Sequence, residues 1–526
     1  MSSPLEENYT TLDAIPRIAS SLNNTFHTHR TKPIQWRLKQ LRKLYWGFKD
    51  NEQAVFDALK KDLNKHPVEV WQAELGWVLN DLLFTSANLE KWAKDEPAPD
   101  IPLTFMPLGA KIRKDPLGNV LIIGTYNFPI QLCIGPLIGA IAAGCTAVLK
   151  PSESAPHSAL IMQKIIESSL DPLAYAVVQG AVPETTRLLE QKWDKIFYTG
   201  GEVVAKIVSK KAAETLTPVT LELGGRNPAI VTKNANLHLA ARRLLWAKNM
   251  NAGQVCVSQN YIIIDESVLP TFLAEFKIAF NDFYPAGAKA SPDYARIINK
   301  RQFKRLKTML DNTKGKILYG GSMDEADLFI EPTLIAVTNP RDSLLTDESF
   351  GPLIPILAVP DLDTAIRHAN AISDTPLGVY AFGTAKETSR ILNETRSGGA
   401  TINDGFFHAS LPTLAFGGVG SSGQGSYRGR ASFDCFSHRR SVVKTPGWME
   451  KLIDMRYPPY TEAKMKMSRA MDLSPDFDRD GEKVPGLLGL GAKKKGAAVG
   501  RWMVVILGMF CALYLVVGKM SGLTVE

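Results

Sequence analysis

Hydrophobic residues recur at three- and four-residue spacing through the first part of the chain. Between residues 16 and 94 they alternate with charged residues at this period, as in Trp36, Leu38, Leu41, Leu44, Tyr45 and Phe48. This pattern predicts amphipathic helices. Residues 96–102 (EPAPDIP) interrupt it, because prolines do not continue a helix, and the alternation in 110–113 then predicts an extended segment.

A second pattern begins after residue 116, where short apolar runs are separated by helical stretches. The runs predict strands at 119–124, 146–149, 175–178, 195–198 and 219–223. A further alternating set starts at 228–231 and continues past 350–356. Strands that alternate with helices are typical of parallel, doubly wound sheets.

These patterns predict an α/β fold with two doubly wound parallel-sheet domains. We expect the first domain to comprise residues 1–95 and 115–223, and the second to comprise residues 224–406. Residues 96–114 and 407–460 are expected to form a small β arm and a C-terminal extension.

A shift in composition and a long apolar segment follow this region. Residues 461–500 are richer in Lys, Met, Asp, Gly and Pro, which predicts a linker or a peripheral helix. Residues 502–518 are 17 uncharged positions between Arg501 and Lys519. A helix of this length reaches about 25 Å, the short end of what crosses a bilayer. The alternative is a buried core helix, but the basic flanks favour a transmembrane tail anchor at 501–519.

The residues that flank this segment predict its orientation, and its length predicts the kind of membrane. Basic residues before it keep the preceding chain on the cytosolic side. Its short span suits a thin membrane, either that of the endoplasmic reticulum or the mitochondrial outer membrane.

The charge balance and the cysteines narrow the class of protein. Lys and Arg total 61 against 53 Asp and Glu, so a net charge of +8 is small for 526 residues. This balance does not favour a nucleic-acid partner. Five cysteines without a CxxC pair or zinc-ligand spacing predict a reducing compartment and no metal. The N-terminus has no basic stretch followed by an apolar run, so we expect synthesis in the cytosol.

Cys256 is the first candidate for chemistry. It ends the polar stretch 249–256 (NMNAGQVC), where a packing role explains little, although most lone cysteines are small core residues. A thiolate can attack a carbonyl carbon and later leave from the thioester. Earlier in the chain, Glu222 ends a predicted strand and precedes two glycines. If buried and unpaired it would have a raised pKa and act as a base; a salt bridge or a helix cap is the alternative.

Two further motifs follow predicted strands. Asn127 lies in 124–129 (GTYNFP), from where its amide can donate to an oxyanion, although Asn before Pro also occurs in structural turns. Lys150 and Glu153 lie in 148–153 (VLKPSE), at positions from which a cofactor's ribose hydroxyls can be bound.

Together these motifs resemble the NAD(P)-dependent aldehyde dehydrogenase superfamily from about residue 34 to 460. Further matches support the class 3 branch, which includes membrane-anchored fatty aldehyde dehydrogenases. They are 348–352 (ESFGP), 416–423 (FGGVGSSG), 425–427 (GSY), 436–440 (FSHRR) and 456–460 (RYPPY).

The resemblance implies roles for single residues. Cys256 would be the nucleophile, Asn127 would hold the oxyanion, and Glu222 would activate the hydrolytic water. Lys150 and Glu153 would bind the adenosine ribose, while Glu348 and Phe350 would position the nicotinamide end. The family's cofactor loop would correspond to Thr199, Gly200, Gly201 and Ala205.

One departure from the family pattern affects the cofactor. Ala205 stands where the family usually has glycine, and Glu202 adds a negative charge beside the loop. The acidic Glu153 should repel a 2′-phosphate, so the resemblance implies NAD, with NADP possible in this class.

The resemblance also implies a substrate and an assembly. We expect oxidation of long-chain aliphatic aldehydes by a homodimer, in which the first domain binds NAD and the arm makes the oligomer. Residues 462–473 are a candidate lid over the substrate funnel. An aromatic aldehyde such as 4-hydroxybenzaldehyde, in quinone biosynthesis, is the alternative substrate. An inactive membrane-tethered scaffold is the alternative from another class of protein.

Overall fold

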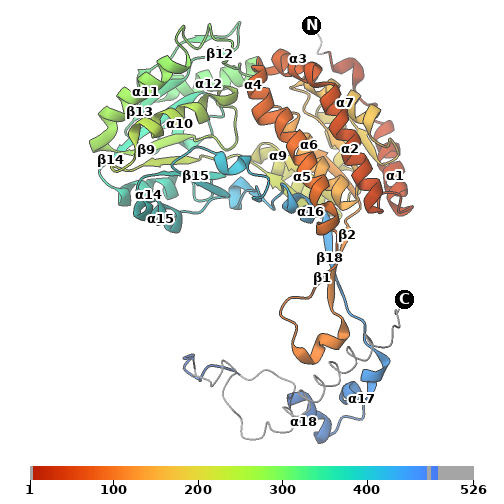
Figure 1. The fold of residues 1–526 in the computed structure, drawn as a ribbon. Helices are drawn as coiled ribbons and strands as arrows, with labels where there is room; N and C mark the ends of the chain where they lie inside the picture. Colours follow the sequence, from red (N-terminus) through yellow and green to blue (C-terminus); the bar gives the residue numbers. More distant parts are fainter. Residues whose placement is uncertain (1–3, 471–474, 484–526) are drawn as a thin grey trace. The chain divides into compact units, whose positions relative to one another are not determined.

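The computed structural model describes residues 4–470 and 475–483 (Figure 1). Contacts divide the chain into two compact units. The main unit comprises the residues up to 94 together with 115–438, and the arm unit comprises 95–114 with the described residues from 439 onward. The main unit contains every residue that the sequence analysis assigned to catalysis or cofactor binding.

The main unit opens with helices, as the apolar period predicted. They are α1 (Ala14–His27), α2 (Ile34–Asp50), α3 (Glu52–Leu63), α4 (Pro67–Val70), a π-helical turn (Trp71–Leu75) and α5 (Gly76–Trp92). In α2 the apolar positions Leu38, Leu41, Leu44 and Phe48 are buried. The prediction of amphipathic helices is therefore confirmed.

A six-stranded sheet follows these helices. Its strands are β3 (Asn119–Ile123), β4 (Thr146–Lys150), β5 (Tyr175–Val177), β6 (Lys195–Thr199), β7 (Val219–Glu222) and β17 (Gly423–Gln424). Their order is β17-β7-β6-β3-β4-β5. Neighbouring strands are parallel except β17, which is antiparallel to β7. All five predicted runs are strands, which confirms the α/β class with a parallel sheet.

Helices cover both faces of this sheet. The connecting helices are α6 (Gln131–Ala143), α7 (Pro156–Ser169), α8 (Val182–Leu189) and α9 (Glu202–Glu214). In β3, Val120 and Ile122 pack into the core shared with α2, α5, α6 and α7, whereas Leu121 and Ile123 pack into the core shared with α1, α8 and α9. Because successive side chains in a strand point to opposite faces, a strand buried on both faces is apolar throughout.

A seven-stranded sheet forms the second half of the main unit, in the order β10-β13-β14-β9-β8-β15-β16. Its strands are β8 (Pro228–Val231), β9 (Tyr261–Asp265), β10 (Lys316–Tyr319), β13 (Thr333–Val337), β14 (Leu353–Val359), β15 (Gly378–Phe382) and β16 (Gly399–Ile402). Only β10 pairs antiparallel. The longer helices between these strands are α10 (Leu237–Asn249), α11 (Leu269–Phe283), α12 (Lys300–Asn312), α14 (Leu362–Ile372) and α15 (Ala385–Glu394).

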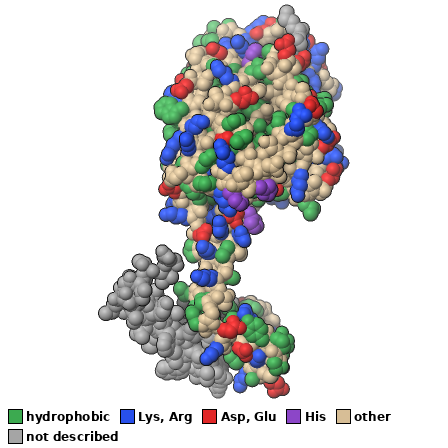
Figure 2. Space-filling view, turned by 90° about the vertical axis from the view of Figure 1, so that its right-hand side faces the viewer, with side chains coloured by type: hydrophobic (Ala, Val, Ile, Leu, Met, Phe, Trp, Pro, Cys, Tyr) green, Lys and Arg blue, Asp and Glu red, His purple; other side chains and the backbone are tan. Residues whose placement is uncertain are grey.

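Short elements complete the main unit. They are α13 (Ser343–Thr346), α16 (Arg430–Cys435) and a hairpin of β11 (Met323–Asp324) and β12 (Phe329–Ile330). Figure 2 shows one face of the molecule, on which Lys and Arg side chains are interspersed with Asp and Glu.

The arm unit contains a three-stranded sheet in the order β1-β2-β18. Its strands are β1 (Glu96–Pro97), β2 (Lys111–Pro116) and β18 (Ser437–Val442), and a 3-10 helix spans Leu103–Leu108. The helices α17 (Glu450–Ile453) and α18 (Glu462–Ala470) follow, and α18 lies at the start of the segment predicted to be a linker or a peripheral helix. The predicted tail anchor at 501–519 lies outside the described residues. Among the residues that are described, no helix is both long and apolar enough to cross a membrane.

Candidate active site

The carboxyl ends of parallel strands in the six-stranded sheet carry four of the predicted site residues. Lys150 is the last residue of β4, Thr199 of β6 and Glu222 of β7, while Asn127 follows β3. The strand register pairs Thr199 with Glu222, and Lys150 with the last residue of β3. Ligands of open α/β sheets bind at this edge.

Cys256 lies after a tight turn that ends α10. Asn251, Ala252 and Gly253 have φ angles of 51°, 51° and 76°, in the left-handed region that stops a helix. A Cβ atom on Gly253 would lie 2.3 Å from the carbonyl oxygen of Gly351, so only glycine fits. The turn leaves Cys256 half-buried, with its backbone oxygen accepting a hydrogen bond of 2.8 Å from Asn227 Nδ2. The sequence predicted an accessible thiol in a non-helical stretch, and the structure places it in one.

The surroundings of Cys256 disfavour ionisation of its thiol. Burial, with smaller contributions from the negative charges of Glu348 and Glu222, raises its pKa to about 12. The thiol therefore has to lose its proton to a base when it attacks a carbonyl carbon.

This raised pKa gives a testable pH dependence. Below the pKa the thiolate fraction rises with pH, so alkylation of Cys256 by iodoacetamide should accelerate about tenfold per pH unit between about pH 7 and 9. Mass spectrometry of the Cys256 peptide measures the rate. The fully buried Cys145 is the internal control and should stay unmodified. A rate that levels off near neutrality would show that the thiol has a low pKa.

Glu222 is a buried acid at the end of β7. Its side chain is 3% exposed, and neither carboxyl oxygen has a partner among the described residues. Burial raises its pKa well above the usual range. Its charge also raises the pKa of Tyr427, a buried residue that the charge of Cys256 affects in the same way. Glu222 thus lies within electrostatic reach of the thiol, as a candidate base should.

Asn127 contacts the nucleophile loop directly. Its side chain is 1% exposed, and Nδ2 donates a hydrogen bond of 3.0 Å to the backbone oxygen of Gln254, two residues before Cys256. An amide nitrogen carries two N–H groups, so one remains for an oxyanion formed at Cys256. The structure therefore brings Asn127 and the Cys256 segment together.

Lys150 and Glu153 form an ion pair at the end of β4. Lys150 Nζ lies 2.9 Å from Glu153 Oε2 and donates to the backbone oxygen of Pro151 at 2.9 Å. Lys150 is buried, whereas the Glu153 side chain is 39% exposed. The pair presents a cation and an anion together, which is the donor and acceptor set that ribose hydroxyls need.

The glycine pair after β6 leads into α9. A Cβ atom on Gly201 would meet nothing within 4 Å, so this helix start faces open space. Thr199 Oγ1 is buried without a partner among the described residues. The Ala205 side chain, in contrast, packs into the core between α9 and the sheet. Glu202 pairs with Lys206 at 2.6 Å on the exposed side of the helix.

Glu348 and Phe350 lie in a loop of the seven-stranded sheet and reach the strand-end edge of the six-stranded sheet. A Cβ atom on Gly224 would lie 2.3 Å from Glu348 Oε2, and the Gly225 backbone donates to the same carboxylate. Burial raises the pKa of Glu348 to about 7. Phe350 has a φ of 46° and packs edge-on against Tyr126, with ring centroids 6.0 Å apart.

Lys248 is a residue near the site that the sequence analysis missed. It is 1% exposed, and burial lowers its pKa to about 7 against the opposing charge of Glu348. Its Nζ lies 3.1 Å from the Gln259 oxygen and 3.3 Å from Ser349 Oγ. The sequence signal for this residue was a lysine beside the apolar residues of α10. It did not predict a buried lysine, because charged residues on helices are usually solvated.

Comparison with known proteins settles the family. The sequence profile of the aldehyde dehydrogenase family matches residues 8–442. The chain belongs to the aldehyde dehydrogenase family. This aldehyde dehydrogenase is accordingly an aldehyde-oxidising oxidoreductase that uses NAD, with NADP possible. The family resemblance drawn from the motifs is confirmed.

Several relatives cover most of this aldehyde dehydrogenase. A β-apo-4′-carotenal oxygenase of Neurospora crassa is 52% identical over 516 residues, which are 96% of this chain and 97% of the relative. Aldehyde dehydrogenase family 3 member A2 of Mus musculus is 41% identical over 449 residues, 85% of this chain and 92% of the relative. The substrate-bound structure of Staphylococcus aureus AldH superimposes with a TM-score of 0.84 at 38% identity, over 87% of this chain and 99% of that one.

Proposed function

We propose that this aldehyde dehydrogenase oxidises a long, apolar aldehyde to the carboxylic acid through a thioester on Cys256. Glu222 carries the proposal: it is a buried acid without a partner among the described residues, at a strand end and within electrostatic reach of Cys256. Such a group is unfavourable for folding, and buried acids of this kind concentrate at functional sites.

The proposed reaction uses three side chains. Cys256 Sγ gives its proton to a water molecule and bonds to the carbonyl carbon, while the new oxyanion accepts hydrogen bonds from Asn127 Nδ2 and the Cys256 backbone N–H. A bound NAD or NADP supplies the hydride acceptor for the oxidation. Glu222 then takes a proton from a water molecule, which attacks the thioester carbon, and passes this proton to the departing Cys256 sulfur, so that the acid and the Cys256 thiol are released.

The residues present fit a dinucleotide. The pair Lys150–Glu153 can bind ribose hydroxyls, and the open helix start at Gly201 can receive a pyrophosphate. Exposed apolar side chains on the first turns of α9, which the sequence analysis overlooked, offer a surface for an adenine ring: Val203, Val204 and Ile207. The exposed Glu153 carboxylate supports NAD over NADP, because it would repel a 2′-phosphate. Glu348 and Phe350 remain the candidates for the nicotinamide end.

The surroundings of the thiol support an apolar substrate. Cys256 packs against a hydrophobic cluster that includes Phe128, Leu132 and Met250. Trp246, at the edge of the same cluster, stacks on Phe406 with centroids 5.3 Å apart. The sequence suggested a fatty aldehyde, and the names of the relatives from Neurospora crassa and Gibberella fujikuroi add an apocarotenal as a second candidate.

Substrate comparison tests this proposal. The full-length protein in detergent is given hexadecenal, β-apo-4′-carotenal or 4-hydroxybenzaldehyde, each with NAD and with NADP, and NADH or NADPH formation is measured. We expect kcat/KM to be highest for one of the two long aldehydes, with NAD. Preference for 4-hydroxybenzaldehyde would overturn the apolar substrate, and no turnover of any aldehyde would overturn the reaction.

We also propose that the chain is a tail-anchored homodimer. The apolar positions 502–518 support the anchor, and β18, an edge strand of the arm sheet, supports pairing with a second copy. Full-length protein made in cells should stay with membranes after alkaline carbonate washing, whereas a chain ending at residue 483 should be released. Release of both proteins from the membranes would contradict the tail anchor. A monomeric mass for the detergent-solubilised protein would contradict the homodimer.

A further inference from the structure

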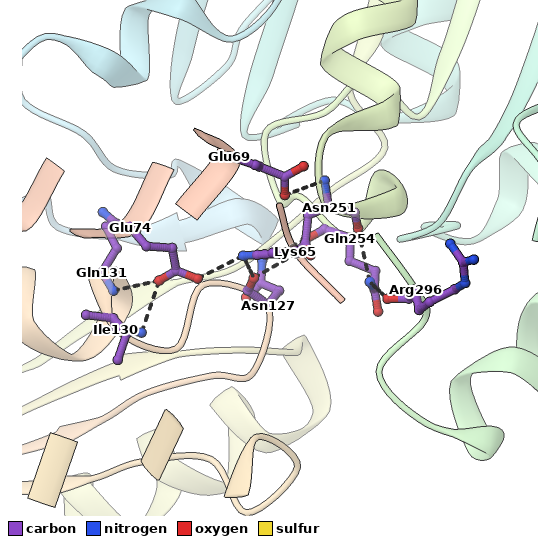
Figure 3. A network of polar contacts seen from close by, with 9 residues as sticks. All are labelled: Lys65, Glu69, Glu74, Asn127, Ile130, Gln131, Asn251, Gln254 and Arg296. Atoms are coloured by element: carbon purple, nitrogen blue, oxygen red, sulfur yellow. Dashed lines mark hydrogen bonds and ion pairs between the residues drawn. The ribbon is translucent and has the colours of Figure 1, made fainter. Parts of the chain in front are cut away.

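We propose that a buried ion pair, Lys65 with Glu74, positions Asn127 and the nucleophile for catalysis (Figure 3). We call residues 124–130 the Asn127 loop and residues 250–256 the Cys256 loop. The inference rests on the oxyanion role proposed for Asn127. Lys65 and Glu74 act through other residues, so they are positioning residues.

The pair lies between the opening helices and the Asn127 loop. Lys65 follows α3, and Glu74 lies in the π-helical turn. Lys65 Nζ is 2.8 Å from Glu74 Oε1, and both side chains are fully buried. Removing two charges from water is unfavourable unless each makes further hydrogen bonds. The remaining contacts of the pair therefore show what it holds.

Lys65 and Glu74 hold opposite ends of one short stretch. Lys65 Nζ donates to the backbone oxygen of Asn127 at 2.9 Å and lies 4.1 Å from the centroid of the Phe128 ring. Glu74 Oε2 accepts from the backbone nitrogens of Ile130 at 3.1 Å and Gln131 at 3.0 Å, where α6 begins. The cation thus holds a carbonyl, and the anion holds the N–H groups of a helix start.

The same carbonyl links the two loops. Asn251 Nδ2 donates to the Asn127 oxygen at 2.7 Å and to the Gln254 oxygen at 3.1 Å. Asn127 Nδ2 donates to the Gln254 oxygen in return, at 3.0 Å. Gln254 Nε2 is fixed in turn by the backbone oxygens of Asn251 and Arg296. A displacement of the Asn127 backbone would therefore move the amide that faces the oxyanion and the segment that carries the nucleophile.

A second carboxylate ties the Cys256 loop to the same helical segment. Glu69 Oε1 accepts from the Asn251 backbone nitrogen at 3.0 Å. Burial raises the pKa of Glu69 to about 7, and Lys65 opposes this rise. Burial also raises the pKa of Glu74, again against Lys65. Lys65 is thus the cation that favours the charged form of both carboxylates.

Stability alone does not account for this arrangement. Well-packed apolar residues of similar size often replace a buried ion pair with equal or greater stability. They cannot hold a carbonyl and two N–H groups in fixed directions. Because an error of about 1 Å in the reacting geometry can lower a rate about 10²-fold, directed hydrogen bonds are the advantage that the pair offers.

The test uses full-length protein with Lys65→Met, with Glu74→Gln, and with both residues made apolar as Lys65→Met/Glu74→Leu. We expect each to lower kcat for hexadecenal about 10- to 100-fold, with KM for NAD within about twofold. The apolar double variant should unfold at a urea midpoint close to that of the wild type, and this separates positioning from stability. Wild-type kcat in the folded double variant would overturn the proposal.

Asn127 provides a second readout that a structural role would not give. In an Asn127→Ala background, Lys65→Met should lower kcat by less than about threefold, because the group that it positions is gone. An equal loss in both backgrounds would overturn the proposal. The matched control is Asp81→Asn, which disrupts another buried pair, Asp81–Arg428 at 3.5 Å, and should leave kcat unchanged.

A readout without turnover separates this inference from the proposed function. Iodoacetamide alkylation of Cys256 reports the Cys256 loop whether or not an aldehyde is oxidised. Lys65→Met should change its rate more than about threefold, and Asp81→Asn should not. If the wild type oxidised no aldehyde, the proposed function would fail. The alkylation rate would then test the positioning role by itself, and an unchanged rate in Lys65→Met would overturn that role.

Discussion

Replacing Cys256 by alanine should abolish aldehyde oxidation, with kcat at least about 10⁴-fold below the wild-type value. The reason is that none of the other thiols in the described part of the chain is available to take its place. Among the described residues, Cys133 and Cys145 are fully buried, and Cys435 is half-buried with its sulfur 3.4 Å from Thr220 Oγ1. Without the covalent step, neither the oxyanion donors nor the base has an intermediate to act on. NADH formation with hexadecenal measures the loss.

Cys145→Ala is the matched control for this substitution. It removes a fully buried thiol that contacts the Phe436 backbone oxygen at 3.4 Å, in the same half of the main unit as Asn127 and Glu222. We expect wild-type kcat from Cys145→Ala and an unchanged urea midpoint for Cys256→Ala. Turnover by folded Cys256→Ala within about tenfold of the wild type would rule out the covalent mechanism.

Glu222→Gln should trap the reaction at the thioester. Glutamine keeps the size of the side chain but cannot take a proton from water, so we expect steady-state kcat to fall about 10²- to 10⁴-fold. A first turnover of NADH should remain and appear as a burst that approaches the enzyme concentration. Intact-protein mass spectrometry should then show one added acyl group, and peptide mass spectrometry after digestion should place it on the Cys256 peptide.

The stability of this variant follows from the pKa of Glu222. Because burial raises that pKa well above the usual range, the fold disfavours the charged carboxylate, and a neutral amide of the same size should leave the urea midpoint nearly unchanged. Glu184→Gln is the matched control. The buried Glu184 carboxylate accepts a hydrogen bond of 2.7 Å from the Ala181 backbone nitrogen, and its replacement should leave kcat unchanged. Loss of the burst along with the steady state would show instead that Glu222 is needed for thiol attack.

The sequence predicted most of the main unit because its signals are local. After a polar first residue, runs such as 119–124 and 195–198 continue with apolar or aromatic residues at 120–123 and 196–198, as expected of residues buried on both faces of a sheet. The ends of these strands then indicated where polar side chains would meet. Lys150, Thr199 and Glu222 were predicted to be site residues on that basis and on the family motifs, and the structure places all three at one edge.

The Lys65–Glu74 pair was beyond the reach of the same analysis. A lysine and a glutamate nine positions apart in a charged helical region are normally on the surface, and nothing local shows that both are fully buried. Their partners, Asn127, Ile130 and Gln131, lie far along the chain. The motif comparison likewise did not predict that Ala205 packs into the core, because it showed only that a glycine of the family pattern is replaced.

The sequence by itself thus determined the alternation of strands and helices, the residue types needed for thiol chemistry, and the family, because each of these is written in local periodicity and short motifs. The tertiary structure decided which of those residues lie within hydrogen-bonding distance and in what electrostatic surroundings. Glu222 has no hydrogen-bond partner among the described residues, and Lys65 reaches Asn127, only because separate segments exclude water around them. Burial depends on the whole fold, and burial sets the pKa of an acid and the strength of an ion pair.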